Sequence, residues 1–189
     1  VICSLQDEDV WVDAMDEPYR SHIWKLMGEK VLDTDALIAV SDYFAKQMKM
    51  KMSIPDDKLH VVHIGVDPAR YNVCNPNIDV PTIGFLSRLN RENGFEVLVD
   101  AFIKLKGNAR FSNARLRVTG GKTGDDDKFI SRQVDKLKRK GFQNDIEFVE
   151  DFRTEALGRF FDGLTLLSVP VLEGEAFGLY QLESLASGI

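Results

Sequence analysis

The sequence predicts an α/β fold in which a doubly wound parallel sheet carries helices on both faces. From about residue 82 onward, short apolar runs of β type alternate with longer segments whose apolar residues recur every three or four positions. The apolar runs are nearly continuous, which is typical of strands that are covered on both faces. Strands that are joined in this way through helices run parallel, with right-handed crossovers.

Composition limits the size and class of the protein. The chain has 189 residues, of which 44% are hydrophobic and 29% charged, which is enough for one domain or for one domain and a part. Its 24 Lys and Arg against 30 Asp and Glu give a net charge of −6, which argues against a protein that wraps nucleic acid. No run approaches the roughly 18 apolar residues that a membrane span needs. Cys3 and Cys74 form no C-x-x-C pair, so we expect neither a disulfide framework nor a zinc ribbon. We expect the protein to occupy a reducing compartment.

The first third of the chain, residues 1–64, predicts a partial α/β unit. Residues 65–81, which include Gly65 and three prolines, have no periodicity, so we expect an interdomain linker there. In order along the first unit, the expected elements are a strand over 1–5, a helix over about 17–28, a strand over 36–40, a helix over about 43–52 and a strand over 59–63.

The second unit, residues 82–189, has the strand and helix order from which the fold is predicted. One of its helices, over about 94–106, has an apolar stripe that includes Leu98 and Phe102. The expected strands are 82–86, 116–119, 146–149 and 164–169, and the other expected helices are a charged segment around 130–137 that ends near Gly141, a short helix over 156–161 with Thr154 as its N-cap, and 179–186.

Two arginines follow the first strand of the second unit, at a place where open parallel sheets bind their ligands. Such ligands lie beyond the carboxyl ends of the strands, next to helix N-termini. Arg88 and Arg91 precede a helix there, where they would suit an anion such as a phosphate. The alternative is that both arginines pair with surface carboxylates, and this segment alone does not decide between the two interpretations.

A pair of glycines, Gly120 and Gly121, follows the next strand. The surrounding residues fit neither a Walker A loop nor G-x-G-x-x-G, so the pair allows either a close approach of a ligand to the backbone or a tight turn. The run 125–127 of three aspartates lacks the spacing of a calcium loop, and we expect it to be a solvated helix start. The histidines have no spacing typical of a ligand set, and we expect no metal site.

The segment after the fourth strand places two glutamates, Glu175 and Glu183, in an E-x7-E arrangement. Eight helical residues rise about 12 Å, which is too wide for the paired carboxyls of a glycosidase. The glutamates suit two separate groups of hydroxyls on one long ligand, with the N–H groups near Phe177, Gly178 and Leu179 facing an anion between them. The alternative is that Glu175 stabilises the helix dipole and that Glu183 is a surface residue.

This segment resembles the E-x7-E region of the retaining glycosyltransferases of family 4, the glycosyl transferases of group 1, which have the two-domain GT-B fold with Rossmann-like domains. Three other segments resemble the family as well, and order and spacing agree over about residues 33–188. These segments are residues 35–41, which resemble a late strand of the N-terminal domain, Gly65-Val66-Asp67 with Tyr71, which resemble the interdomain N-G-V-D turn, and Arg88-Leu89 with Gly94, which resemble the R-L-x-x-x-K-G loop.

The resemblance implies roles for individual residues. Arg88 would be the catalytic cation on the diphosphate of the donor, and Glu175 would accept hydrogen bonds from the hydroxyls of the donor sugar. Glu183 would hold the ribose of the nucleotide. The remaining donor-binding residues would be Gly120 and Gly121, which would line the nucleotide pocket, and Phe177, Gly178 and Leu179, which would present backbone N–H groups to the phosphates or the sugar.

The chain departs from the family pattern at two positions. Asn93 stands where the family has a lysine, and Ile64 stands where it usually has an asparagine. Losing the lysine removes a cation from the leaving group. Arg91, two residues earlier, would then supply the missing charge, or the diphosphate site would be weakened.

The function implied by the resemblance is transfer of a sugar from a nucleotide-diphosphate sugar to a glycan, lipid or small-molecule acceptor, with retention of anomeric configuration and without a metal or other cofactor. We expect a cytoplasmic protein with no nucleic-acid partner, and association with the inner face of the membrane stays open. Two complete GT-B domains need about twice this length, so we expect a fragment that is inactive alone and whose donor domain is C-terminally incomplete. The alternative is a non-catalytic nucleotide-sugar-binding or scaffold domain of the same fold.

Overall fold

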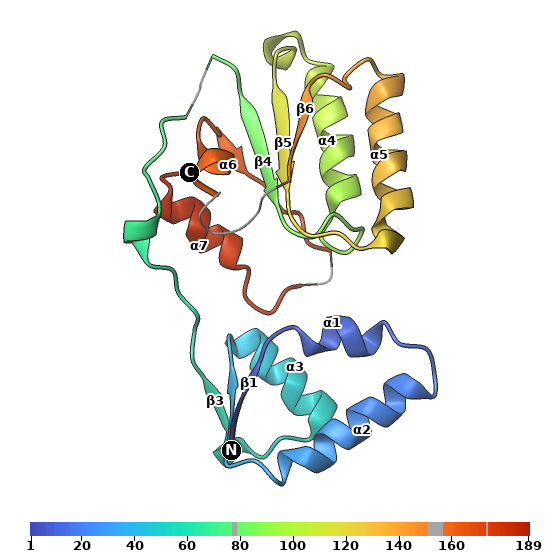
Figure 1. Ribbon diagram of the computed structural model, residues 1–189, viewed down its shortest axis with the longest axis vertical. Coiled ribbons are helices and arrows are strands. Elements are labelled where there is room, and N and C mark those ends of the chain that lie inside the picture. The colour runs from blue at the N-terminus through green and yellow to red at the C-terminus, as the bar shows by residue number, and fades with distance from the viewer. Residues whose placement is uncertain (77–78, 151–156, 173) are drawn as a thin grey trace. The chain divides into compact units, whose positions relative to one another are not determined.

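The protein consists of two compact units, each with its own parallel sheet (Figure 1). The computed structural model describes residues 1–76, 79–150, 157–172 and 174–189. The first unit comprises Val1–Gly65 and Glu175–Gly178, and the second comprises Val66–Gly174 and Leu179–Ile189.

The first unit is a three-stranded sheet in the order β1-β2-β3, with both strand pairs parallel. Helix α3 packs against β2 and β3, and α2 packs against α3. The strands are β1 (Ile2–Leu5), β2 (Ala36–Ala39) and β3 (Leu59–Val61). The helices are α1 (Glu8–Asp13), α2 (Tyr19–Val31) and α3 (Asp42–Met52), and a 3₁₀ turn, η1 (Asp56–Lys58), precedes β3.

Helix α2 does not end at Gly28, as the sequence predicts, but continues to Val31. A β-carbon at position 28 would lie 3.2 Å from the carbonyl oxygen of Met52, so the glycine allows α2 to pass close to the end of α3. The ammonium group of Lys58 donates hydrogen bonds to the carbonyls of Val31 and Thr34, at 3.2 and 2.6 Å, which satisfies acceptors at the helix end. Tertiary contacts, rather than the glycine, therefore determine where α2 ends.

The second unit is a four-stranded parallel sheet in the order β6-β5-β4-β7. Figure 1 shows α4 and α5 on one face of this sheet and α6 and α7 on the other, which confirms the predicted doubly wound fold. The strands are β4 (Thr82–Leu86), β5 (Arg115–Thr119), β6 (Ile146–Val149) and β7 (Leu166–Leu167). The helices are α4 (Phe95–Lys106), α5 (Asp127–Arg139), α6 (Leu157–Phe161) and α7 (Leu179–Ala186), with 3₁₀ turns η2 (Pro68–Arg70), η3 (Ala109–Phe111) and η4 (Gly124–Asp126).

Two of the predicted elements of this unit differ in extent. The strand predicted over 164–169 is only two residues long, although backbone hydrogen bonds from Thr165 to Thr82 and from Ser168 to Gly84 extend its pairing with β4. It is an edge strand, so it is paired on one side only. The predicted N-cap Thr154 and the helix residue Ala156 lie outside the described residues.

Separate apolar clusters cover the two faces of the second sheet. Gly84 of β4 faces α6, and a β-carbon at this position would lie 2.5 Å from a methyl group of Leu164, so the missing side chain lets the α6 layer pack closely. On the α4–α5 face, the fully buried members include Phe85, Phe95, Val99, Phe102, Leu116, Val118 and Leu137. On the α6–α7 face, the cluster includes Leu86, Leu157, Phe160, Phe161, Leu164 and Tyr180.

The strand order creates a topological switch point between β4 and β7. The chain proceeds from β4 to β5 and β6 on one side and then returns to place β7 on the other side of β4. In open parallel sheets the crevice beyond the carboxyl ends of the strands at such a point is where ligands bind. The loops after β4 and β7 are therefore the first place to look for a site.

Candidate functional site

Three loops at the carboxyl edge of the second sheet pack against one another. They follow β4 (residues 87–94), β5 (residues 120–123) and β7 (residues 168–172). Backbone hydrogen bonds join them, because loops this close would otherwise leave buried N–H and C=O groups without partners. These bonds run from the N–H of Ser87 to the carbonyl of Thr119 (3.3 Å), from Leu89 to Gly121 (3.1 Å) and from Leu172 to Glu92 (2.9 Å).

Two glycines make this packing possible. Gly94 and Gly120 have φ angles of +77° and +142°. A β-carbon at Gly94 would lie 1.9 Å from the carbonyl oxygen of Pro170, and one at Gly120 would lie 1.9 Å from that of Ser87. Any side chain would collide with backbone at both positions. At Gly121, by contrast, no atom lies within 4 Å of the added β-carbon, so the second glycine of the pair borders open space.

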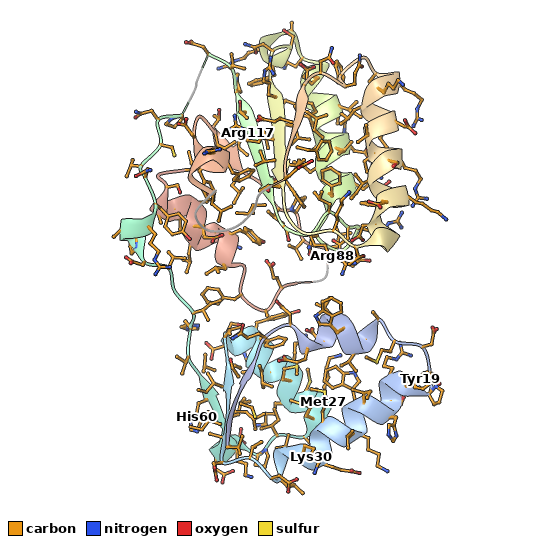
Figure 2. All side chains as sticks on the ribbon, in the orientation of Figure 1. Tyr19, Met27, Lys30, His60, Arg88 and Arg117 are labelled. Carbon is orange, nitrogen blue, oxygen red and sulfur yellow. The ribbon has the colours of Figure 1, made fainter. Side chains whose placement is uncertain are left out.

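Arg88 is held in the loop after β4 by residues from the loop after β5. Its Nε donates to Oδ2 of Asp126 at 3.0 Å, and its Nη2 donates to the Thr123 hydroxyl at 3.1 Å. The guanidinium remains about one third exposed, and Figure 2 shows Arg88 at the carboxyl edge of the sheet. Nη1 of Arg88 makes no hydrogen bond to any residue that the structure describes. The arginine is thus fixed in position with donors to spare.

The partner of Arg88 corrects one prediction. The aspartate run was expected to be a solvated helix start, but Asp126 is only 7% exposed, and the side chain of Asp125 lies outside the described part. Burial raises the pKa of Asp126, but hydrogen bonds from Arg88 and Thr123 outweigh it and hold that pKa below its ordinary value. Asp126 also accepts from the backbone N–H of Thr123 at 2.7 Å, in a capping box at the start of η4. The interpretation that Arg88 pairs with a carboxylate is correct, but the carboxylate is buried.

Arg91 and Asn93 have other contacts. Arg91 is exposed and pairs with Glu96 in the first turn of α4 at 3.2 Å. The Asn93 amide donates to the carbonyl of Arg88 at 3.3 Å, so this side chain stabilises the loop. Both Arg91 and Glu96 line a groove of 360 Å³ whose other lining residues belong to α5. Arg91 therefore does not lie among the partners of Arg88.

Glu183 lies in the second turn of α7 and is only 9% exposed, so the alternative of a surface residue is wrong. Its Oε1 accepts a hydrogen bond from the hydroxyl of Tyr71 at 3.1 Å. Burial raises the pKa of Glu183, and the hydrogen bond from Tyr71 offsets only part of this effect. Burial and the neighbouring carboxylate raise the pKa of Tyr71 to about 12. The carboxyl group that was predicted to hold a ribose is therefore partly desolvated and has a neutral donor beside it.

The first half of the E-x7-E segment belongs to the first unit. Glu175, Phe177 and Gly178 are grouped with it, whereas Leu179 begins α7 in the second. Ala176 is buried in the core of the first unit, and its carbonyl accepts a hydrogen bond from the Ser41 hydroxyl at 2.5 Å. The predicted site residues thus divide between the two units, and within the second unit the loop of Arg88 packs against the loop of Gly120.

The described parts of the chain contain neither a cluster of metal-ligating side chains nor a helix suited to crossing a membrane. No group of three or more His, Cys, Asp or Glu side chains could hold a metal ion there. None of the described helices has both the length and the apolar composition that a membrane crossing requires.

Comparisons with known proteins agree with this architecture. The family model "Glycosyl transferases group 1" matches residues 73–189. No curated protein has significant sequence similarity to the chain. Among solved structures, Anabaena Alr3699/HepE in complex with UDP and glucose is 12% identical with a TM-score of 0.78, over 98% of this chain and 50% of that one.

Two further structures are similar. Sucrose-phosphate synthase from Thermosynechococcus elongatus is 17% identical with a TM-score of 0.75, over 99% of this chain and 48% of that one. The C-terminal domain of LpcC, a group 1 family protein from Francisella tularensis, is 22% identical with a TM-score of 0.56, over 65% of this chain and 67% of that one. The chain therefore spans about half the length of the two-domain structures that it matches.

Proposed function

The chain belongs to the glycosyl transferases group 1 family, whose model matches more than half of it, and we propose that it carries the donor site of an enzyme that transfers a sugar from a nucleotide-diphosphate sugar to an acceptor. The observation that carries this proposal is the position of Arg88. This partly exposed cation is held by the buried carboxylate of Asp126 at the switch point of a doubly wound sheet. In this proposal residues 82–189 supply the donor site, residues 1–64 come from the acceptor-side domain, and residues 65–81 link the two.

The position of Arg88 suits the chemistry. Cleavage of a sugar–diphosphate bond leaves negative charge on the β-phosphate, and a preorganised guanidinium stabilises that charge without a bound metal. Asp126 fixes the guanidinium through Nε and Nη2, so that Nη1 can donate to a phosphate oxygen without further ordering of the side chain. The acceptor would attack from the face that the diphosphate leaves, which retains the anomeric configuration.

The other predicted residues have complementary roles. Glu183 would accept from the ribose hydroxyls, and Glu175 would accept from the hydroxyls of the sugar. Gly120 and Gly121 would lie beside the nucleotide, and the open space around Gly121 supports this. The backbone N–H groups of Phe177, Gly178 and Leu179 would face the phosphates or the sugar.

The donor and the acceptor are proposed only as classes. The solved structure of Anabaena Alr3699/HepE contains UDP and glucose, which makes UDP the first nucleotide to test. A glycan, a lipid or a small molecule would serve as the acceptor. A lipid acceptor would bring the whole protein to the inner face of the membrane from the cytoplasm.

A second candidate function is a non-catalytic nucleotide-sugar-binding or scaffold domain. Asn93 favours it, because the family lysine is replaced by a side chain that bonds to the loop's own backbone, and Arg91 pairs with Glu96 instead of replacing the lysine. Both candidates bind a nucleotide, so only turnover separates them. Hydrolysis of a nucleotide sugar by the full-length protein supports the enzyme, and binding without any turnover supports the scaffold.

Calorimetric titration of the chain with UDP, GDP and ADP tests the site. We expect weak binding of at least one nucleotide, and a loss of about tenfold or more in affinity for Arg88→Ala, because a charge-assisted contact to phosphate is removed. Arg91→Ala is the matched control and should change the affinity by less than about twofold. Absence of binding to all three nucleotides, or equal effects of the two substitutions, would overturn the assignment.

A further inference from the structure

Tyr71 and Glu183 form a contact that the predicted role of Glu183 does not include. The hydroxyl of Tyr71 donates to Oε1 of Glu183 at 3.1 Å, across 112 residues of chain. Tyr71 follows η2 in the segment before β4, and its ring packs against the apolar cluster of the α6–α7 face. Three residues later, the N–H of Cys74 donates to the carbonyl of Ser187, at 2.8 Å, just after the end of α7. The segment is therefore attached to α7 and its C-terminal end at two points, Tyr71 and Cys74, and this holds the Tyr71 hydroxyl in place.

The contact leaves Glu183 incompletely satisfied. A carboxylate accepts about four hydrogen bonds, and its burial is costly unless most of them are made. In the described part of the chain Tyr71 is the titratable group that faces Glu183, and Arg70 beside it acts on the Tyr71 hydroxyl. Since the pKa of Tyr71 is about 12, the hydroxyl is protonated and donates at neutral pH. Oε1 of Glu183 is thus engaged, whereas Oε2 accepts no hydrogen bond from any described residue.

We propose that Tyr71 is a positioning residue for the nucleotide: by holding Oε1 of Glu183, it fixes the carboxylate so that Oε2 accepts hydrogen bonds from the two adjacent hydroxyls of a ribose. This inference rests on the proposed function, because it takes the ligand of Glu183 to be a nucleotide. It adds a residue outside the E-x7-E segment to the donor site. The role is distinct from packing, because the ring of Tyr71 supplies the packing and the hydroxyl supplies the orientation.

The test compares UDP with 2′,3′-dideoxy-UDP, which lacks both ribose hydroxyls. We expect the unmodified chain to prefer UDP by about tenfold or more, because hydrogen bonds to a charged carboxylate are at stake. Tyr71→Phe keeps the ring and removes the hydroxyl. It should reduce this preference to about threefold or less, while the affinity for the dideoxy nucleotide changes by less than about twofold. Tyr19→Phe, the same substitution at an exposed tyrosine of α2, is the matched control and should keep the full preference.

The pH dependence of UDP binding supplies a second readout that a packing role would not change. A hydrogen bond to the charged form lowers the pKa of a carboxyl group, so its loss in Tyr71→Phe should raise the pKa of Glu183 further. The decline of UDP affinity on acidification should then begin at a higher pH than in the unmodified chain.

The outcomes separate the two proposals. If the unmodified chain binds neither nucleotide, the proposed function fails and the role of Tyr71 fails with it. If the unmodified chain prefers UDP, and Glu183→Gln loses that preference while Tyr71→Phe retains it with an unchanged pH profile, only the positioning role is overturned.

Discussion

Two contacts in the second unit involve side chains of opposite charge, Arg88 and Glu183, and these charges are stabilised in opposite ways. Arg88 is paired with a buried carboxylate, Asp126, whose pKa is lowered by the hydrogen bonds that it accepts from Arg88 and Thr123. Glu183 is also buried, but its partner Tyr71 is neutral, and the pKa of Glu183 is raised. The surroundings of Arg88 thus stabilise its charge, whereas the surroundings of Glu183 disfavour the charged form of its carboxyl group.

The difference shows which of the two charges is compensated by an opposite charge within the protein. The Arg88–Asp126 pair contributes to folding, since the two charges compensate each other. The Glu183 carboxylate costs folding energy whenever it is ionised, because one phenol does not replace the water that it loses. Buried carboxyl groups with raised pKa values are candidates for function, so Glu183 adds support to the site that Arg88 indicates.

The largest expected effect comes from a substitution that disrupts the loop of Arg88 and leaves the Tyr71–Glu183 contact intact. Gly120→Ala places a β-carbon 1.9 Å from the carbonyl of Ser87, in a backbone conformation that favours glycine, and so must displace the loop that carries Arg88. We expect a loss of about 3 kcal/mol in the free energy of unfolding, measured by urea denaturation. UDP affinity should fall by about tenfold or more in the protein that remains folded.

Gly121→Ala is the matched control for this substitution. No atom lies within 4 Å of its β-carbon, and we expect a change within about 0.5 kcal/mol in the free energy of unfolding. Equal destabilisation by the two alanines would contradict the close packing of Gly120 against Ser87.

The second effect distinguishes the two carboxyl groups by the sign of their pH dependence. The lowered pKa of Asp126 means that its contribution to stability is fully present above the ordinary value of 3.8 and is lost as the pH falls below it. The raised pKa of Glu183 means that its ionisation destabilises the folded state, and this cost grows as the pH rises from 4.5 through the folded pKa. Acidification therefore weakens one contribution and relieves the other.

Substitution of Asp126 and of Glu183 by the corresponding neutral amide measures the contribution of each carboxyl group to stability. At neutral pH, Asp126→Asn should lower the free energy of unfolding by about 1 to 2 kcal/mol, because charge-assisted hydrogen bonds to Arg88 are lost. Glu183→Gln should raise the free energy of unfolding under the same conditions. Urea denaturation over a pH series checks this: both differences should shrink toward acidic pH, and a destabilised Glu183→Gln at neutral pH would contradict the account of Glu183 as a desolvated carboxylate.

The sequence predicts the fold well where periodicity is long. The apolar stripe with Leu98 and Phe102 predicts α4 to within one residue at its start, and the second sheet follows the predicted order of strands and helices. Helix α1 was not predicted, because its six residues are fewer than two turns and contain no repeat to detect. The end of α2 was predicted wrongly at Gly28, because contacts with Met52 and Lys58 come from distant segments.

The candidate site is less predictable than the fold. The rule that ligands lie at the carboxyl ends of parallel strands selects Arg88, and the spacing of the glutamates selects Glu183. Their partners Asp126 and Tyr71 could not be assigned, since the contacts span 38 and 112 residues. Nothing in a run of three aspartates singles out the middle one, and only the folded chain buries it.

The smallest expected effect comes from adding a second positive charge to the loop of Arg88. Asn93→Lys restores the family's cation on the loop of Arg88 at the cost of the 3.3 Å hydrogen bond to its carbonyl. If the diphosphate lies along this loop, UDP affinity should rise by about three- to tenfold, with a larger gain at low salt because the added attraction is electrostatic. Asn93→Met, which has similar length and no charge, loses the same hydrogen bond and isolates the contribution of the charge. Calorimetry at two salt concentrations decides the matter: equal affinities of the two variants would mean that the diphosphate does not contact this part of the loop, and that Arg88 acts as the loop's cation without a neighbouring lysine.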